Sequence, residues 1–185
     1  VNDVGYQSAC VPASLKAYFE AHAKFGVLPW RDIVAPAIAW AEHGWMVRPH
    51  VEFFWSDPGM MGRASGLDRL AFSESGRKLY CRDGAPKRVG DLVRNSDYAN
   101  TLRMIAEGGS DVFYKGELAR HIARDMREHD GLITLADLAS YQPKWLDPLR
   151  GTYRGYDVTT NNPPGGGLML IEMLNILEHF NLADI

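Results

Sequence analysis

The sequence predicts a mainly α-helical fold with a few β-strands. Apolar residues recur at helical spacing through most of the chain, and glycines or cap-forming residues stand at the ends of these stretches. Residues 153–160 have the composition of a strand. The 185 residues, 46% hydrophobic and 23% charged, are enough to build one ordinary soluble core.

Helical periodicity predicts three helices before residue 56. The first is expected over residues 12–26, because proline suits a first turn and glycine ends a helix. The second should span Arg31–Glu42, where Pro36 is expected to kink or divide it. The third is expected over Trp45–Trp55, although this segment contains Pro49.

The middle of the chain alternates between irregular and helical sequence. Residues 56–90 contain repeated glycine and proline breaks, which predict a loop-rich region with short elements. Asp97 is the expected N-cap of a helix that ends at Gly108-Gly109. A further helix is expected over Tyr114–His129.

The last third of the chain should contain a strand between two helices. Thr134 with Asp137 three residues later resembles a capping box and predicts a short helix. Tyr153–Thr160 should form a strand and Pro163–Gly167 a tight loop. Leu168–Phe180 is apolar around most of its circumference, which predicts a helix buried on nearly all sides.

Charge and hydropathy exclude two classes of partner. The formal net charge is -3, and the arginines of the helix expected over Tyr114–His129 are interleaved with acidic residues. Nucleic-acid binding requires a concentrated basic surface and is therefore disfavoured. No stretch contains the roughly 20 apolar residues that a membrane-spanning helix needs.

One side-chain pattern could hold a metal ion. Glu117, His121, Asp125 and His129 stand four residues apart, so a helix places them along one face. A structural zinc site requires a closed tetrahedral set of ligands, and no cysteine is near in the sequence. A solvated face of alternating acids and imidazoles is the favoured interpretation, and we expect neither a metal nor a cofactor.

The glycine-rich run Pro163–Gly167 precedes an expected helix. Backbone N–H groups at such a position can bind an anion. The phosphate-loop and dinucleotide-binding patterns are both missing. A strand-to-helix turn in which two backbone segments approach closely is therefore the favoured interpretation.

No catalytic nucleophile is evident from the residues alone. The sequence lacks a Gly-x-Ser-x-Gly elbow, and neither Cys10 nor Cys81 has a recognisable reactive setting. Buried free thiols are favoured over a disulfide between these two residues. The aromatic run Phe53–Trp55 could line a pocket, but residues of this kind more often form a core or an interface.

Several short motifs follow one another in a fixed order along the chain. They are Leu28-Pro29-Trp30, Pro36-Ala37-Ile38, Asp97–Ala119, Gly131–Tyr141, Tyr153–Tyr156 and Leu174–Glu178. In this order and spacing they resemble the middle of the large subunit of a γ-glutamyltranspeptidase, and the resemblance spans nearly the whole chain.

The resemblance implies an N-terminal-nucleophile hydrolase with an αββα sandwich, to which strands near Val4–Ala9 and Arg154–Thr160 would belong. In this family the precursor cleaves itself before a threonine, whose hydroxyl attacks the γ-glutamyl carbonyl of a glutathione-like substrate. That threonine stands in a Thr-x-His-Ser/Thr stretch at the start of the small subunit. No threonine of this chain is followed by x-His. We therefore carry over no catalytic residue, no substrate-binding residue and no metal ligand.

The resemblance also implies what surrounds the chain. It would be one segment, residues 1–185, truncated at both ends and inactive alone. The small subunit, or the remainder of the same precursor, would complete it, outside the cytoplasm by family analogy. Asn161–Gly167 replaces the usual Pro-Pro-Pro-Ser-Ser-Gly-Gly, and Phe53–Arg88 matches poorly, which points to a divergent member. A non-catalytic helical scaffold or interaction module derived from the family is the alternative.

Overall fold

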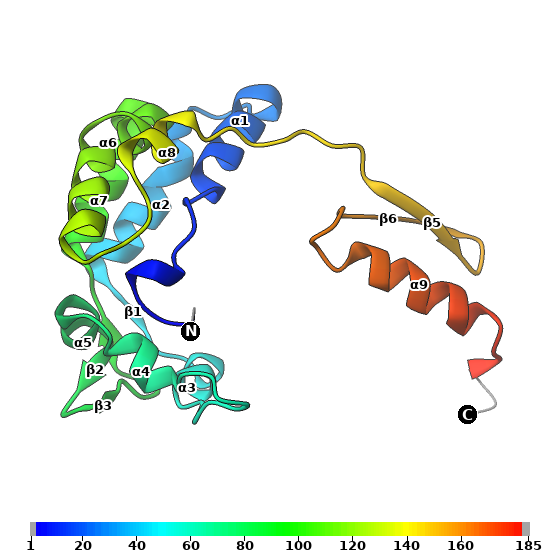
Figure 1. Ribbon diagram of the computed structural model, residues 1–185, viewed down its shortest axis with the longest axis horizontal. Helices are drawn as coiled ribbons and strands as arrows, with labels where there is room; N and C mark the ends of the chain where they lie inside the picture. Colours follow the sequence, from blue (N-terminus) through cyan, green and yellow to red (C-terminus); the bar gives the residue numbers. More distant parts are fainter. Residues whose placement is uncertain (1–2, 183–185) are drawn as a thin grey trace. The chain divides into compact units, whose positions relative to one another are not determined.

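The computed structural model describes residues 3–182. The chain divides into two compact units, Val1–Pro143 and Lys144–Ile185. The first unit contains a group of longer helices and a second group of short elements, and the second unit contains a hairpin and one helix (Figure 1). Most of the regular structure is helical, as the sequence predicts.

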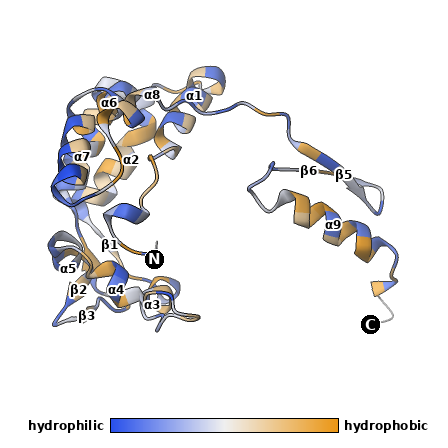
Figure 2. Ribbon diagram, in the orientation of Figure 1, coloured by the Kyte–Doolittle hydropathy of each residue, from blue (hydrophilic) through white to orange (hydrophobic). Residues whose placement is uncertain are grey.

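The main core of the first unit lies between two helices that pack against each other, α2 (Trp30–His43) and α6 (Ser96–Tyr114). The buried residues of this core come from both helices, and the Trp30 indole N–H donates to the Ile105 carbonyl at 3.1 Å. Figure 2 shows that much of α2 is hydrophobic. The core residues are Val34, Ala41, Ala99 and Leu102, with Trp30, Ile38 and Ala106 packed against them.

A second core cluster joins α7 (Glu117–Glu128) to α8 (Leu135–Ser140). Ala119, Ile133 and Leu138 are buried there. The predicted capping box is confirmed: the Thr134 hydroxyl accepts from the Asp137 backbone N–H at 3.2 Å, and the Asp137 carboxylate accepts from the Thr134 N–H at 2.9 Å. This cap fixes the start of α8 above the cluster.

Short elements fill residues 45–93, as the glycine and proline breaks predict. The helices there are α3 (Pro49–Trp55), α4 (Gly66–Leu70) and α5 (Glu74–Tyr80). The strand β1 (Trp45–Met46) pairs with β4 (Leu92–Val93), and β2 (Cys81–Arg82) pairs with β3 (Ala85–Pro86), both antiparallel. The Asp3 carboxylate binds this region to the N-terminal segment, because it accepts from the Ala64 N–H at 2.6 Å and pairs with Arg63 and Arg69.

The second unit is a two-stranded hairpin covered by one helix. Strands β5 (Leu149–Tyr153) and β6 (Tyr156–Thr160) are antiparallel and are joined by Arg154-Gly155, both at positive φ. This two-residue loop matches the right-handed twist of the strands. Helix α9 (Gly167–Glu178) packs on the hairpin, and its Glu178 carboxylate accepts from the Arg154 N–H at 2.7 Å.

Helix boundaries agree with the sequence in some places and differ in others. The first helix is α1 (Ser14–Phe25), and a non-helical Gly109 interrupts α6 at the predicted end. Helix α2 is not divided at Pro36. The N-cap of α6 is Asn95 rather than Asp97, because the Asn95 side chain accepts from the Tyr98 N–H.

Four further predictions are wrong. Trp45–Trp55 is not one helix, because β1 pairs with β4 and Pro49 begins α3 at its first turn. The helix expected from Tyr114 begins at Glu117, because Tyr114 still belongs to α6. Residues 4–9 form no strand and contain the 3-10 helix η1 (Tyr6–Ser8). The Cys10 thiol is free but exposed, and the Cys81 thiol is free and half-buried.

Helix α9 is not buried on nearly all sides in this chain. Figure 2 shows it as hydrophobic along most of its length, yet Met169 is 63% exposed and Ile176 is 55% exposed. The hairpin covers one side, where Ile171 contacts Gly151. The distribution of apolar residues in the sequence therefore predicts the apolar character of α9 correctly, but it does not show whether residues of this chain cover the helix.

Candidate functional site

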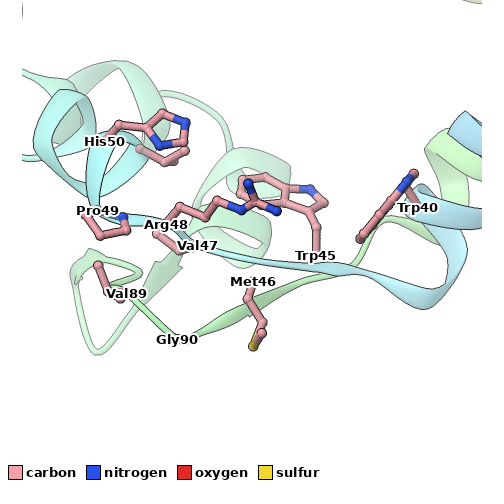
Figure 3. A pocket seen from close by; sticks show the side chains of 10 residues that line it. Trp40, Trp45, Met46, Val47, Arg48, Pro49, His50, Val89 and Gly90 are labelled. Atoms are coloured by element: carbon pink, nitrogen blue, oxygen red, sulfur yellow. The ribbon is translucent and has the colours of Figure 1, made fainter.

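An apolar groove of about 560 Å³ lies beside β1 in the first unit (Figure 3). Its walls come from the last turn of α2, from β1, from the start of α3 and from the loop before β4. Figure 3 shows Trp40 at one end of the groove and His50 toward the other. The lining residues are Trp40, Trp45, Met46, Val47, Arg48, Pro49, His50, Val51, Val89 and Gly90.

Backbone pairing fixes the frame of this groove. Gly44 ends α2 at φ 90, and the chain then enters β1 beside β4. The Val47 N–H donates to the Asp91 carbonyl at 2.9 Å, and the Gly90 N–H donates to the Val47 carbonyl at 3.0 Å. Val47, which lines the groove, is buried, and its backbone N–H and carbonyl are both paired with the segment before β4.

Aromatic contacts support the floor from below. Trp45 meets Trp55 edge to face with ring centroids 5.9 Å apart, and Trp55 meets Tyr80 at 5.4 Å. Edge-to-face pairs of this kind are favourable beyond their buried area. Trp55 is thus a support rather than a lining residue, whereas Phe53 and Phe54 contact each other and are exposed.

Arg48 and His50 are the ionisable residues among those that line the groove. Within residues 3–182 neither side chain makes a hydrogen bond or an ion pair. Two acids adjacent in sequence to lining residues are used elsewhere: the Glu52 carboxylate accepts from the Val89 N–H at 2.6 Å, and Asp91 pairs with Arg82. The Arg88 N–H and the Arg82 guanidinium hold the pKa of Asp91 below its ordinary value, so Asp91 stays ionised in this frame.

The groove can bind but has no means of covalent catalysis in its lining. No serine, threonine, cysteine or lysine lines it. A nucleophile also needs a base within hydrogen-bond reach, and the lining offers only His50 for that role. Its chemistry is that of an apolar surface with one guanidinium group and one imidazole group.

The stripe that sequence analysis weighed as a metal site consists of two separate pairs. The His121 Nε2 atom lies 3.9 Å from Glu117, and the His129 Nδ1 atom lies 3.3 Å from the Asp125 carboxylate. The Tyr6 ring stacks on His129 with centroids 4.4 Å apart, and burial raises the pKa of Tyr6. In the described part of the chain no three His, Cys, Asp or Glu side chains meet where they could hold a metal ion.

The glycine run has the close backbone approach that the turn interpretation predicts. A Cβ atom at Gly167 would overlap the Asn161 carbonyl oxygen, and one at Gly165 would overlap the Asn161 side chain. The Asn162 side chain donates to the Asp147 carbonyl at 2.6 Å and fixes the loop from the other side. The glycines are therefore needed for packing at the start of α9.

Sequence analysis missed the groove, because its frame depends on the pairing of residues 45–47 with residues 90–93, which are far apart in the sequence. The one local signal was Pro49, whose suitability for a first helical turn would have placed a helix start there. The pairing of β1 with β4 leaves no comparable trace in strands of two residues each.

Comparison with known proteins gives one consistent result. The sequence profile of the family described as Gamma-glutamyltranspeptidase matches residues 1–185. The chain is 37% identical over 186 residues to the Acylase ACY 1 proenzyme of Pseudomonas sp. (strain SE83), covering 100% of this chain and 32% of that protein. It is 35% identical over 172 residues to the Glutathione hydrolase proenzyme of Escherichia coli (strain K12), covering 92% of this chain and 28% of that protein.

Solved structures share the fold. The γ-glutamyltranspeptidase of Helicobacter pylori superposes with a TM-score of 0.86 at 31% identity, covering 99% of this chain and 51% of that chain. The cephalosporin acylase of Bacillus halodurans superposes with a TM-score of 0.83 at 34% identity, covering 98% of this chain and 34% of that chain. The chain thus spans about a third of the length of the curated relatives it matches. Within the described residues, no helix has the length and apolar character to cross a membrane.

Proposed function

The chain belongs to the γ-glutamyltranspeptidase family, and from this premise we propose that it is a large-subunit segment of an enzyme that hydrolyses or transfers γ-glutamyl groups. The observation that carries the proposal is the family match over residues 1–185. Its relatives are named as glutathione hydrolase and acylase proenzymes, so the family-level activity is enzymatic. The proposed substrates are glutathione-like γ-glutamyl compounds.

We place the nucleophile in polypeptide outside this chain. There a threonine hydroxyl attacks the γ-glutamyl carbonyl while the α-amino group of the same threonine takes the proton. Backbone N–H groups stabilise the oxyanion, and the α-amino group passes its proton to the leaving amine as the amide C–N bond breaks. Water or an amino acid then cleaves the γ-glutamyl ester and regenerates the threonine hydroxyl. The settings of Thr101 and Thr134 support this placement, because one hydroxyl donates to the Asp97 carbonyl and the other caps α8.

The role of this chain in the reaction is then to hold the missing site. The β5–β6 hairpin and α9 supply part of the proposed αββα sandwich, and the exposed apolar side of α9 is what a further layer would cover. The first unit supplies the surrounding helices. The chain alone is inactive under this proposal and requires its small subunit or the rest of its precursor.

A second candidate is an acylase that prefers an acyl group other than γ-glutamyl. It is favoured by the 37% identity to the Acylase ACY 1 proenzyme and by the 34% identity to a solved cephalosporin acylase. We propose that such an acylase would use the same nucleophile and would accept an acyl group without the α-amino substituent. That difference makes them separable by substrate.

The test compares the 185-residue chain with the complete coding sequence that contains it. Both are assayed with a γ-glutamyl anilide and with its glutaryl analogue, which lacks only the α-amino group. We expect the chain alone to release no aniline, and the complete protein to cleave itself before a threonine and to prefer the γ-glutamyl anilide. Preference for the glutaryl analogue supports the acylase instead. Turnover by the chain alone, or a complete protein that neither cleaves itself nor hydrolyses either anilide, contradicts the proposal.

A further inference from the structure

We propose that the groove beside β1 is a docking surface for a polypeptide segment that carries apolar side chains and one carboxylate. The occupant is supplied by the polypeptide that completes the enzyme, so this inference rests on the proposed function. It goes beyond that function because it names the surface of this chain that the partner uses and the chemistry of the segment that fits it.

The composition of the groove is that of an interface centre. Aromatic residues, Met and Arg are enriched in the core of protein interfaces, whereas Lys, Glu and Asp are depleted. Two tryptophans, one methionine and one arginine line this groove, and no Lys, Glu or Asp does. Tryptophan and arginine are also the residues that most often dominate binding energy.

The charge of the groove specifies one feature of the occupant. Arg48 lines it without an ion pair or hydrogen bond inside the described chain, and the neighbouring acids Glu52 and Asp91 are held by backbone N–H groups at the rim. A planar guanidinium binds a carboxylate through two parallel hydrogen bonds. The complementary segment therefore brings an aspartate or glutamate side chain to Arg48.

The rim of the groove points to a polypeptide rather than a small molecule. A pocket for a small ligand covers about 70–90% of the ligand surface. Here the rim is open, since Trp40 is 60% exposed and Met46 is 65% exposed. A polypeptide segment covers such side chains together with the floor. The relatives supply ample polypeptide for this, because the chain accounts for only 32% of one and 28% of another.

The test measures cysteine reactivity at the rim. Cys10→Ser and Cys81→Ala remove the native thiols, and Met46→Cys then places one thiol in the groove. The matched control is Arg124→Cys, at an exposed position on the polar side of α7. Maleimide labelling rates are measured in the 185-residue chain and in the complete enzyme. We expect the complete enzyme to slow labelling at position 46 by at least about tenfold, equivalent to about 1.4 kcal/mol, and to leave position 124 labelled at a similar rate.

A charge reversal tests the predicted carboxylate. Arg48→Glu should restore fast labelling of Met46→Cys in the complete enzyme, and Arg48→Lys should restore it only partly, because lysine keeps the charge and loses the planar geometry. Arg124→Glu should have no such effect. In the 185-residue chain, Arg48→Glu should leave the unfolding midpoint unchanged, because Arg48 has no partner there.

The possible outcomes distinguish the docking surface from the proposed function. Equal labelling at position 46 in the chain and in an active complete enzyme overturns the docking surface and leaves the proposed function standing. Protection at position 46 in a complete protein without hydrolase activity supports the docking surface and contradicts the proposed function. If phenylpropionate at submillimolar concentration protects position 46 in the chain alone, the groove is a small-anion site and the inference is wrong.

Discussion

The Tyr114 hydroxyl donates a 2.6 Å hydrogen bond to the carbonyl oxygen of Pro12, which lies 102 positions earlier in the chain. The same hydroxyl accepts from the Lys16 N–H at 3.1 Å, and the Tyr114 side chain is fully buried. One phenol group at the end of α6 therefore satisfies two backbone groups at the start of α1. Helix α1 has no side-chain cap of its own, so this contact fixes its position.

Tyr114→Phe should destabilise the first unit by about 1–3 kcal/mol, because it removes two part-buried hydrogen bonds, each of which contributes about 0.5–1.5 kcal/mol. The measurement is a urea unfolding curve of the 185-residue chain. Tyr98→Phe is the control, since the Tyr98 side chain is exposed and its hydroxyl makes no hydrogen bond within the described residues. Equal midpoints for Tyr114→Phe and the unmodified chain would contradict this role.

Leu138→Ala should cost about 2–5 kcal/mol, because Leu138 is fully buried in the cluster with Ala119 and Ile133 and its removal leaves a cavity. Leu135→Ala removes the same atoms from the same helix at a position that is 43% exposed. We expect that control to shift the urea midpoint only slightly. A comparable loss at both positions would mean that α8 does not anchor the cluster.

Gly109→Ala should destabilise the first unit by about 1–3 kcal/mol, because Gly109 has φ 64 and ψ -160, a conformation that side chains disfavour. A Cβ atom there would also lie 3.1 Å from two ring carbons of Phe19. Gly84→Ala is the control, since Gly84 has φ 78 but no neighbour within 4 Å of the added atom. Thermal unfolding should rank Gly109→Ala as clearly more damaging than Gly84→Ala, and the opposite ranking would contradict the packing argument.

Asp3→Asn should make the free energy of unfolding depend less on pH in the acidic range. The Ala64 N–H, followed by the Arg63 guanidinium, holds the pKa of Asp3 below its ordinary value of 3.8. The unfolded chain therefore binds a proton more readily than the folded chain near this pH. The contribution of Asp3 is complete above its ordinary pKa and is lost as pH falls through the lower folded value.

The measurement for Asp3 is the urea midpoint between about pH 6 and about pH 2. Asp3→Asn should be less stable at the upper end of this range and lose less on acidification than the unmodified chain. Asp83→Asn is the control, because the Asp83 carboxylate makes no contact of this kind within the described residues. If the urea midpoints of Asp3→Asn and the unmodified chain fall equally as the pH is lowered, the ion pairs of Asp3 with Arg63 and Arg69 contribute nothing to stability.

Local signals in the sequence predicted the longer helices well. The periodic stripe of residues 31–42, the glycine break at Gly109 and the capping box of Thr134 all appear in the structure, because each depends on residues within a few positions of one another. The strand predicted at Tyr153–Thr160 is confirmed only over Tyr156–Thr160, which is β6. Its first residues are the end of β5 and the turn at Arg154-Gly155, so the predicted single strand is in fact part of a hairpin.

Contacts between distant residues account for the failures. Trp45 and Met46 have the apolar character of a helix, and only their pairing with Leu92 and Val93 makes them a strand. The groove depends on the same pairing, so its lining could not be grouped from the sequence. The partner of α9 also lies beyond periodicity, which shows that a surface is apolar and says nothing of what covers it.

The two units differ in how far apart in the sequence their contacting residues lie. Arg154 meets Glu178 across 24 positions, whereas the Gln7 side chain meets Asp130 across 123. Loop-closure entropy grows with the logarithm of loop length, by about 0.6 kcal/mol for each doubling. The contact between Arg154 and Glu178 therefore closes at a lower entropic cost than the contact between Gln7 and Asp130. The second unit needs only its own residues for this closure, whereas the segment around Gln7 becomes ordered only when the end of α7 is already in place.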